Sequence, residues 1–150
     1  MADATSELLQ IYRHDFASFT QRAFLEINPD EALDWNWSHD LICHCLNRLE
    51  AGDARRQMVL IPPRSLKSFI CTNAWTAFLI GRRPSAKLIA VSYSQTLADD
   101  HSRLVIKLMQ SDWYKAVFPE TRLASAKPAA EQFFTTAGGY RLATSVGGTL

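Results

Sequence analysis

The stretch MVLIPPRSLKSFICTNAW, Met58 to Trp75, decides how the chain is interpreted, because its pattern predicts a strand, a turn and a helix in succession. The turn, IPPRSLKS, has the spacing of a phosphate-binding loop, G-x-x-x-x-G-K-[ST], and places Lys67 and Ser68 in its last two positions. Ile61 and Leu66 stand where that pattern has glycine. The stretch therefore predicts either an unusual nucleotide site or a Lys-Ser pair that follows a strand by chance.

The predicted setting favours a nucleotide site, because backbone N–H groups and the helix dipole at a helix start hold phosphate. Lys67 would reach the terminal phosphates, Ser68 would place its hydroxyl on Mg²⁺, and Arg64 adds a guanidinium suited to phosphate oxygens. Pro62 and Pro63 stiffen the entrance to the loop. Without glycine, Leu66 must adopt a left-handed conformation at some cost, or the loop is built differently.

Composition indicates one ordinary globular domain with a core of its own. The 150 residues are 47% hydrophobic and 21% charged, and the net charge of +1 gives no general attraction to nucleic acid. Three cysteines fit a reducing compartment rather than a disulfide scaffold. We expect no membrane span, since no apolar run is long enough.

The order of predicted elements indicates an α/β fold, with helices before and between buried strands. Gly52 should end the second helix, and Ala137-Gly138-Gly139 should form the turn of a hairpin. A helical entry segment over residues 1–52 would precede an α/β domain over residues 53–150. The expected elements are helices over 6–27 and 38–50 (the second capped by Ser38), a strand over 55–62, a helix to Gly81, a strand over 86–93, a helix over 94–110, a short piece over 112–119 and the hairpin over 133–145.

The segment HDLICHC holds four potential metal ligands, His39, Cys43, His44 and Cys45. On a helix His39 and Cys43 share one face, whereas His44 and Cys45 point elsewhere. No second Cys/His pair at zinc spacing follows, so ordinary helix packing is favoured over metal binding.

Several motifs together resemble the large terminase subunits, the ATPase motors that package DNA in tailed phages and prophages. MVLIPPRSLKS looks like their Walker A region, which commonly has Pro-Pro-Arg followed by Lys-Ser. WSHDLICHCLNRLEAGDARRQMVL is similar to the helix that leads into that strand, and AKLIAVSYSQTLADDHSRLV to the strand, turn and helix that follow. GGYRLATSVGGTL is similar to the stretch ahead of the second acidic motif. The resemblance runs from Trp37 to Leu150, although the family often has glycine where Leu66 stands.

The resemblance implies a P-loop NTPase fold of the RecA/ASCE type, with a partial parallel sheet, and an ATPase that drives viral DNA into procapsids. Its expected ligands are ATP and Mg²⁺, and its expected partners are double-stranded DNA, the portal protein and the small terminase subunit, in a homo-oligomeric ring in the cytoplasm of a bacterial host. Lys67 and Arg64 would be catalytic, Ser68 would bind magnesium, and Trp37 and His39 would border the adenine. Ser92, Tyr93 and Ser94 would couple nucleotide to DNA. The expected cofactor-binding residues are Trp37, His39, Pro63, Arg64, Ser65, Leu66, Lys67 and Ser68.

The same resemblance implies that residues 53–150 end before the acidic Walker B strand, and that the family's endonuclease domain lies outside the chain. We therefore expect negligible ATP hydrolysis by these 150 residues alone. Simpler roles stay open for several residues: Arg64 as a solvated turn residue, Trp37 and His39 as packing residues, and Ser92 to Ser94 as a polar turn. Two other functions also remain open, a non-catalytic α/β remnant or assembly module and a helicase-like or transposition-like P-loop ATPase.

Overall fold

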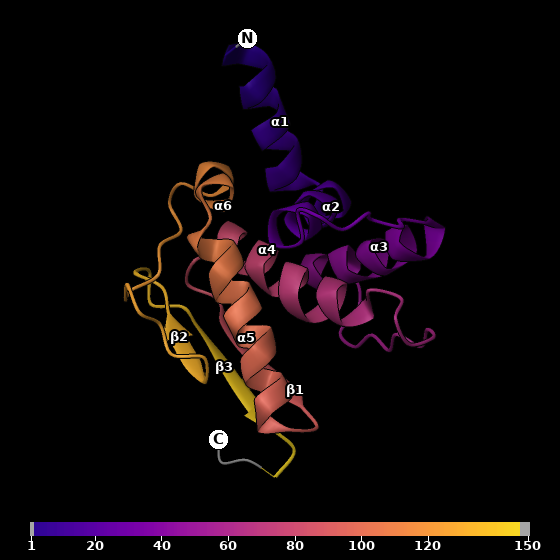
Figure 1. Ribbon diagram of the computed structural model, residues 1–150, viewed down its shortest axis with the longest axis vertical. Helices are drawn as coiled ribbons and strands as arrows, with labels where there is room; N and C mark the ends of the chain where they lie inside the picture. The colour runs from indigo at the N-terminus through magenta and orange to yellow at the C-terminus, as the bar shows by residue number, and fades with distance from the viewer. Residues whose placement is uncertain (1, 148–150) are drawn as a thin grey trace. The chain divides into compact units, whose positions relative to one another are not determined.

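The computed structural model describes residues 2–147, with side chains from residue 4 (Figure 1). The chain forms two compact units, Met1–Trp75 and Thr76–Leu150, which are described separately. None of the helices in the described part of the chain is long and apolar enough to cross a membrane.

The first unit is helical, with α1 (Ala2–His14), α2 (Phe16–Ile27) and α3 (Trp37–Ala51). The single helix predicted over residues 6–27 is therefore wrong, because the chain breaks at Asp15. That residue has an extended backbone, and its Oδ2 accepts a hydrogen bond of 2.7 Å from the Ser18 N–H. A carboxylate that caps a new helix start competes with continuation of the old helix.

The two ends of α3 are set by local hydrogen bonds. Asn36, rather than the predicted Ser38, is the N-cap: its side chain accepts from the Ser38 N–H at 3.0 Å. The Asn36 N–H in turn donates to His39 Nδ1 at 3.1 Å, so the two residues form a reciprocal capping box. The predicted stop at Gly52 is confirmed, with a left-handed φ of 84°.

The core of the first unit is rich in aromatic side chains. Phe16 packs edge-on against Trp75 with ring centroids 4.8 Å apart, and Phe24 packs likewise against Phe69 at 5.4 Å. The remaining buried apolar residues come from α2, α3 and the helix after the loop: Phe19, Ala23, Ile27, Ile42, Cys43, Leu46, Ile70 and Ala74.

The strand predicted over residues 55–62 does not form, and this prediction is wrong. The segment is irregular. Met58 is 77% and Leu60 83% exposed, whereas Val59 and Ile61 are partly buried. A strand requires a neighbour for its backbone hydrogen bonds, and every strand of the described residues belongs to the second unit. The expectation that Lys67 lies beyond the carboxyl end of a strand therefore also fails.

The helix after the loop begins at Lys67 and continues to Arg82, one residue past the predicted end. Its first part is a π-helical segment, η1 (Phe69–Ala74), and the rest is α4 (Trp75–Arg82). Isolated π-helical turns inside helices are uncommon and often lie at functional sites.

The second unit contains a three-stranded mixed sheet in the order β1-β3-β2. β1 (Lys87–Ser92) pairs in parallel with β3 (Tyr140–Ser145), and β2 (Gln132–Phe134) pairs antiparallel with β3. The predicted hairpin is thus confirmed, and its turn contains Gly138 with a φ of 81°. The α/β class is confirmed, but the sheet is only partly parallel.

α5 (Gln95–Gln110) packs against β1 and β3 (Figure 1). β1 was predicted as a buried strand, and this is only half correct. Its residues alternate between partly buried and exposed. Ile89 is 56% and Val91 59% exposed. β1 is an edge strand with one open face, so its branched residues reflect strand propensity rather than burial on both sides.

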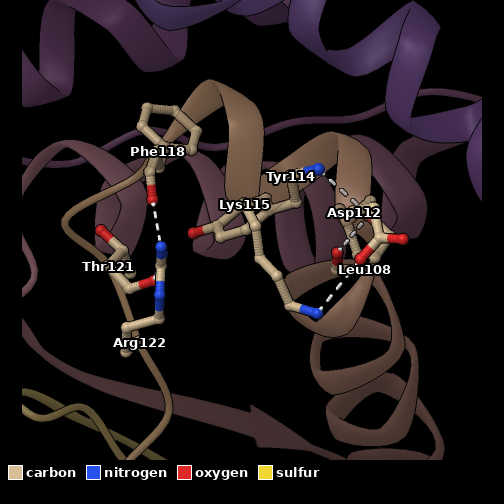
Figure 2. A network of polar contacts seen from close by, with 8 residues as sticks. Leu108, Asp112, Tyr114, Lys115, Phe118, Thr121 and Arg122 are labelled. Atoms are coloured by element: carbon tan, nitrogen blue, oxygen red, sulfur yellow. Dashed lines mark hydrogen bonds and ion pairs between the residues drawn. The ribbon is translucent and has the colours of Figure 1, made fainter.

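α6 (Asp112–Val117) is fixed by a polar network that Figure 2 shows in close-up. The Tyr114 N–H donates to Ser111 Oγ, Lys115 pairs with Asp112 at 3.4 Å, and Arg122 donates to the Phe118 and Thr121 carbonyls. Two longer-range bonds attach this region to α4. The buried Tyr114 hydroxyl donates to the Ala77 carbonyl at 2.8 Å, and the Thr121 hydroxyl donates to the Gly81 carbonyl at 3.0 Å.

Candidate nucleotide-binding site

The loop over residues 62–68 has an unusual backbone. Arg64 and Leu66 have φ values of 63° and 53°, and they are the only non-glycine residues of the described chain with positive φ. Of the two expected alternatives, a left-handed Leu66 or a loop built differently, the structure has the first. Such a conformation costs an L-residue about 1–2 kcal/mol, so the surrounding structure holds two strained residues within one short turn.

The helix start follows this turn directly. The first intrahelical bond runs from the Ile70 N–H to the Leu66 carbonyl, at 2.9 Å. The backbone N–H groups of Lys67, Ser68 and Phe69 therefore belong to the first helical turn, where no carbonyl precedes them at the right spacing. A helix start of this kind attracts an anion through both the N–H groups and the helix dipole.

Lys67 and Ser68 are both exposed, at the point where this turn enters the helix. The Ser68 side chain makes no capping hydrogen bond, so its hydroxyl can meet a ligand. One turn further on, burial raises the pKa of the Cys71 thiol, and the positive charge of Lys67 opposes that increase. The ammonium therefore acts electrostatically on the first turn of its own helix.

Three cavities of the first unit have residues of the loop in their walls. The loop itself, residues 62–69, lines a cavity of about 470 Å³. A second cavity of about 290 Å³ is lined by Arg64, Ser65 and Leu66, by the segment before α3, and by the first turn of α3, which includes His39. A third cavity of about 310 Å³ contains Lys67, Ser68 and Cys71 in its wall. The structure thus brings all the predicted loop residues, Pro63 to Ser68, to one set of adjoining cavities, with His39 beside them.

His39 and Trp37 have different surroundings. His39 is 2% exposed, its Nδ1 accepts the Asn36 N–H, and its ring lies 5.0 Å from the ring of Trp35. Trp35 is held in turn by a hydrogen bond of 2.8 Å from Nε1 to Asp40. Trp37 is 75% exposed and is not part of the wall that His39 lines. His39 therefore shapes the cavity and caps the helix, whereas Trp37 faces solvent.

Sequence reasoning missed three polar residues that line the cavity beside His39, namely Glu31, Asp34 and Asn36. They come from the acidic stretch NPDEALDWNW, which the sequence shows only as a helix break. Carboxylates and amides in a cavity can accept hydrogen bonds from ligand hydroxyl or amino groups. The sequence does show a run of polar residues immediately before a predicted helix. Such a run also predicts an N-cap, so it does not by itself indicate a cavity wall.

In the HDLICHC segment, His39 and Cys43 are buried while His44 is exposed and Cys45 partly so, which confirms the predicted faces. Burial, followed by the negative charge of Asp40, raises the pKa of Cys43 to about 12. Among the described residues no group of three or more His, Cys, Asp or Glu is arranged to hold a metal ion.

The predicted turn after β1 lies in the second unit. Ser92 ends β1, Tyr93 is 81% exposed, and Ser94 is the N-cap of α5, where its hydroxyl accepts from the Leu97 N–H at 3.3 Å. Ser94 therefore has a clear structural role, and Tyr93 presents an aromatic ring to solvent.

Comparison of the chain with models of known families, with curated proteins and with solved structures finds no match.

Proposed function

We propose that the chain is the ATP-binding part of a DNA-packaging motor of the large terminase type, with residues 62–68 as its phosphate-binding loop. The observation that carries this proposal is the left-handed backbone of Arg64 and Leu66 immediately before a helix that begins at Lys67. A loop that reverses direction in this way lets successive N–H groups converge on an anion. Strain at two residues that lack glycine's freedom is typical of a functional loop.

The residues of the loop suit a triphosphate. The N–H groups of the first helical turn and the Lys67 ammonium would hold phosphate oxygens, and the Arg64 fork would bind the terminal phosphate and stabilise its charge during transfer. His39 and the acidic residues before α3 line the adjoining cavity, which is where the nucleoside would lie. No part of this assignment uses the strand that was predicted before the loop.

One protein group would bind magnesium, the Ser68 hydroxyl. It is exposed and makes no capping hydrogen bond. Mg²⁺ keeps several waters and binds phosphate oxygens, so a single hydroxyl suits its usual coordination in nucleotide sites. When bound, the ion would neutralise charge on the phosphates. The double-stranded DNA, portal protein and small terminase subunit remain proposed partners, on the strength of the sequence resemblance.

The test is equilibrium binding of a fluorescent ATP analogue in the presence of Mg²⁺. We expect Lys67→Ala to weaken binding at least tenfold, because it removes the only lysine of the loop. Ser68→Ala should weaken binding in Mg²⁺ but not when the metal is chelated. Lys127→Ala, which alters an exposed lysine of the second unit, is the matched control and should bind like the parent chain. Unchanged affinity in Lys67→Ala would refute the proposed site.

One observation favours a second function, a non-catalytic assembly module. Residues 56–62 are irregular, where a P-loop ATPase needs a strand, and Met58 and Leu60 present apolar surface to solvent. Such a module would bind another protein through this segment and would bind no nucleotide. Saturable Mg-ATP binding that depends on Lys67 excludes it, and the absence of binding by the parent chain supports it.

A further inference from the structure

Arg141 is the largest fully buried side chain among the described residues, and it lies in the middle strand of the sheet. It belongs to β3, pairs in register with Leu88 and Phe133, and is 0% exposed. Its Nε, Nη1 and Nη2 atoms have no hydrogen-bond partner among the described residues. A guanidinium carries five N–H donors and stays charged, so burying it unpaired is costly.

A second unsatisfied polar group lies on the helix that packs against β3. Ser102 of α5 is also 0% exposed, and its hydroxyl has no hydrogen-bond partner within the described part of the chain. Its neighbour His101 has a lowered pKa, caused first by burial and then by the positive charge of Arg141. The guanidinium therefore acts on α5 at the position of residue 101.

The register of α5 against β3 agrees with this placement. Gln95 Nε2 donates to the Ala143 carbonyl at 3.1 Å, which fixes the start of the helix beside residue 143. The helix follows β1, which is parallel to β3, and it runs back along the sheet. Two strand residues span about 6.6 Å, or about four to five helical residues, which brings Arg141 to the level of residues 99–100, within one helical turn of Ser102.

We propose that Arg141 and Ser102 form a binding site for a small oxyanion between α5 and β3. The guanidinium offers paired donors to two oxygens of the anion, and the Ser102 hydroxyl donates to a third. His101, the neighbour of Ser102 in the sequence, is partly exposed. The ligand class is a phosphate-type or carboxylate anion, and the site is separate from the loop around Lys67, on which it does not depend.

Thermal unfolding of the whole chain in salts of equal ionic strength tests this proposal. We expect phosphate to raise the unfolding midpoint by several degrees relative to chloride, because a ligand that binds only the folded state stabilises it. Sulfate should act like phosphate. An equal rise in acetate would identify carboxylates as ligands as well, whereas a rise in phosphate and sulfate alone would identify tetrahedral anions.

The variants test whether the rise comes from this site. Arg141→Met should lose the phosphate-dependent rise, and its midpoint in chloride should equal or exceed that of the parent chain, since an uncompensated buried charge is gone. Lys127→Ala, which removes an exposed lysine outside both sites, should keep the full rise. Ser102→Ala, a small change that should not prevent folding, should lose at least half of the rise. No rise in the parent chain, or an undiminished rise in Ser102→Ala and Arg141→Met, would overturn the proposal.

Discussion

Replacing Leu66 by glycine and by alanine tests whether the loop has its strained backbone in solution. Both changes remove nearly the same side chain, so the difference between them reports on the backbone. At a φ of 53° alanine retains a strain of about 1–2 kcal/mol that glycine does not have. Glycine loses about 0.5–1 kcal/mol more conformational entropy on folding. The glycine variant should therefore be more stable than the alanine variant by about 1 kcal/mol.

The matched control is the adjacent Ser65, which does not have a positive φ. There the order should reverse, and Ser65→Ala should be more stable than Ser65→Gly by about 0.5–1 kcal/mol. Urea unfolding followed by tryptophan fluorescence suits this comparison, because three of the four tryptophans, Trp35, Trp37 and Trp75, lie in the first unit. Equal or greater stability of Leu66→Ala relative to Leu66→Gly would refute the left-handed conformation at Leu66.

Two further predictions concern the folded chain as a whole. Because the pKa of Cys43 is raised from 9.0 to about 12, the unfolded state releases that proton first, so stability should fall as pH rises above about 9. Between pH 8 and about pH 10.5, Cys43→Ala should reduce the fall in the free energy of unfolding by about 2 kcal/mol, as measured by urea unfolding. The same dependence of the free energy of unfolding on pH in both proteins would contradict the burial of Cys43. In the hairpin turn, a Cβ at Gly139 would overlap the Pro84 carbonyl oxygen, so Gly139→Ala should cost more than about 2 kcal/mol. Gly138→Ala meets open space and should cost about 1 kcal/mol through its positive φ, and equal thermal midpoints for the two variants would disprove the close approach.

Local signals in the sequence were sufficient for much of the fold. Gly52 ended α3 as predicted because a left-handed C-cap needs only glycine, and the Gly138-Gly139 turn formed the expected hairpin for a similar reason. The left-handed backbone at Leu66 was one of two alternatives that the sequence left open, because a phosphate-binding loop normally has glycine at that position.

The failures required information that is not local. The apolar run over residues 55–62 has strand propensity, but a strand forms only where a partner accepts its hydrogen bonds. Asp15 divides the predicted helix over residues 6–27 in two, because its carboxylate caps the start of α2. The spacing of apolar residues gives no sign of such a cap. In the sequence, nothing distinguishes Arg141 from an exposed arginine on a strand. Its burial is seen only in the structure, where α5 packs on the sheet.

The central claim is that the N–H groups of the loop and of the helix start that follows it, from Arg64 to Phe69, hold the phosphates of a nucleotide. The most direct measurement is the change in backbone amide NMR shifts when Mg-ATP is added to the intact chain. The account predicts the largest shifts at Arg64, Leu66, Lys67 and Ser68, smaller shifts near His39, and loss of all of them in Lys67→Ala. Absence of shifts in the loop, or shifts that persist unchanged in Lys67→Ala, would contradict it.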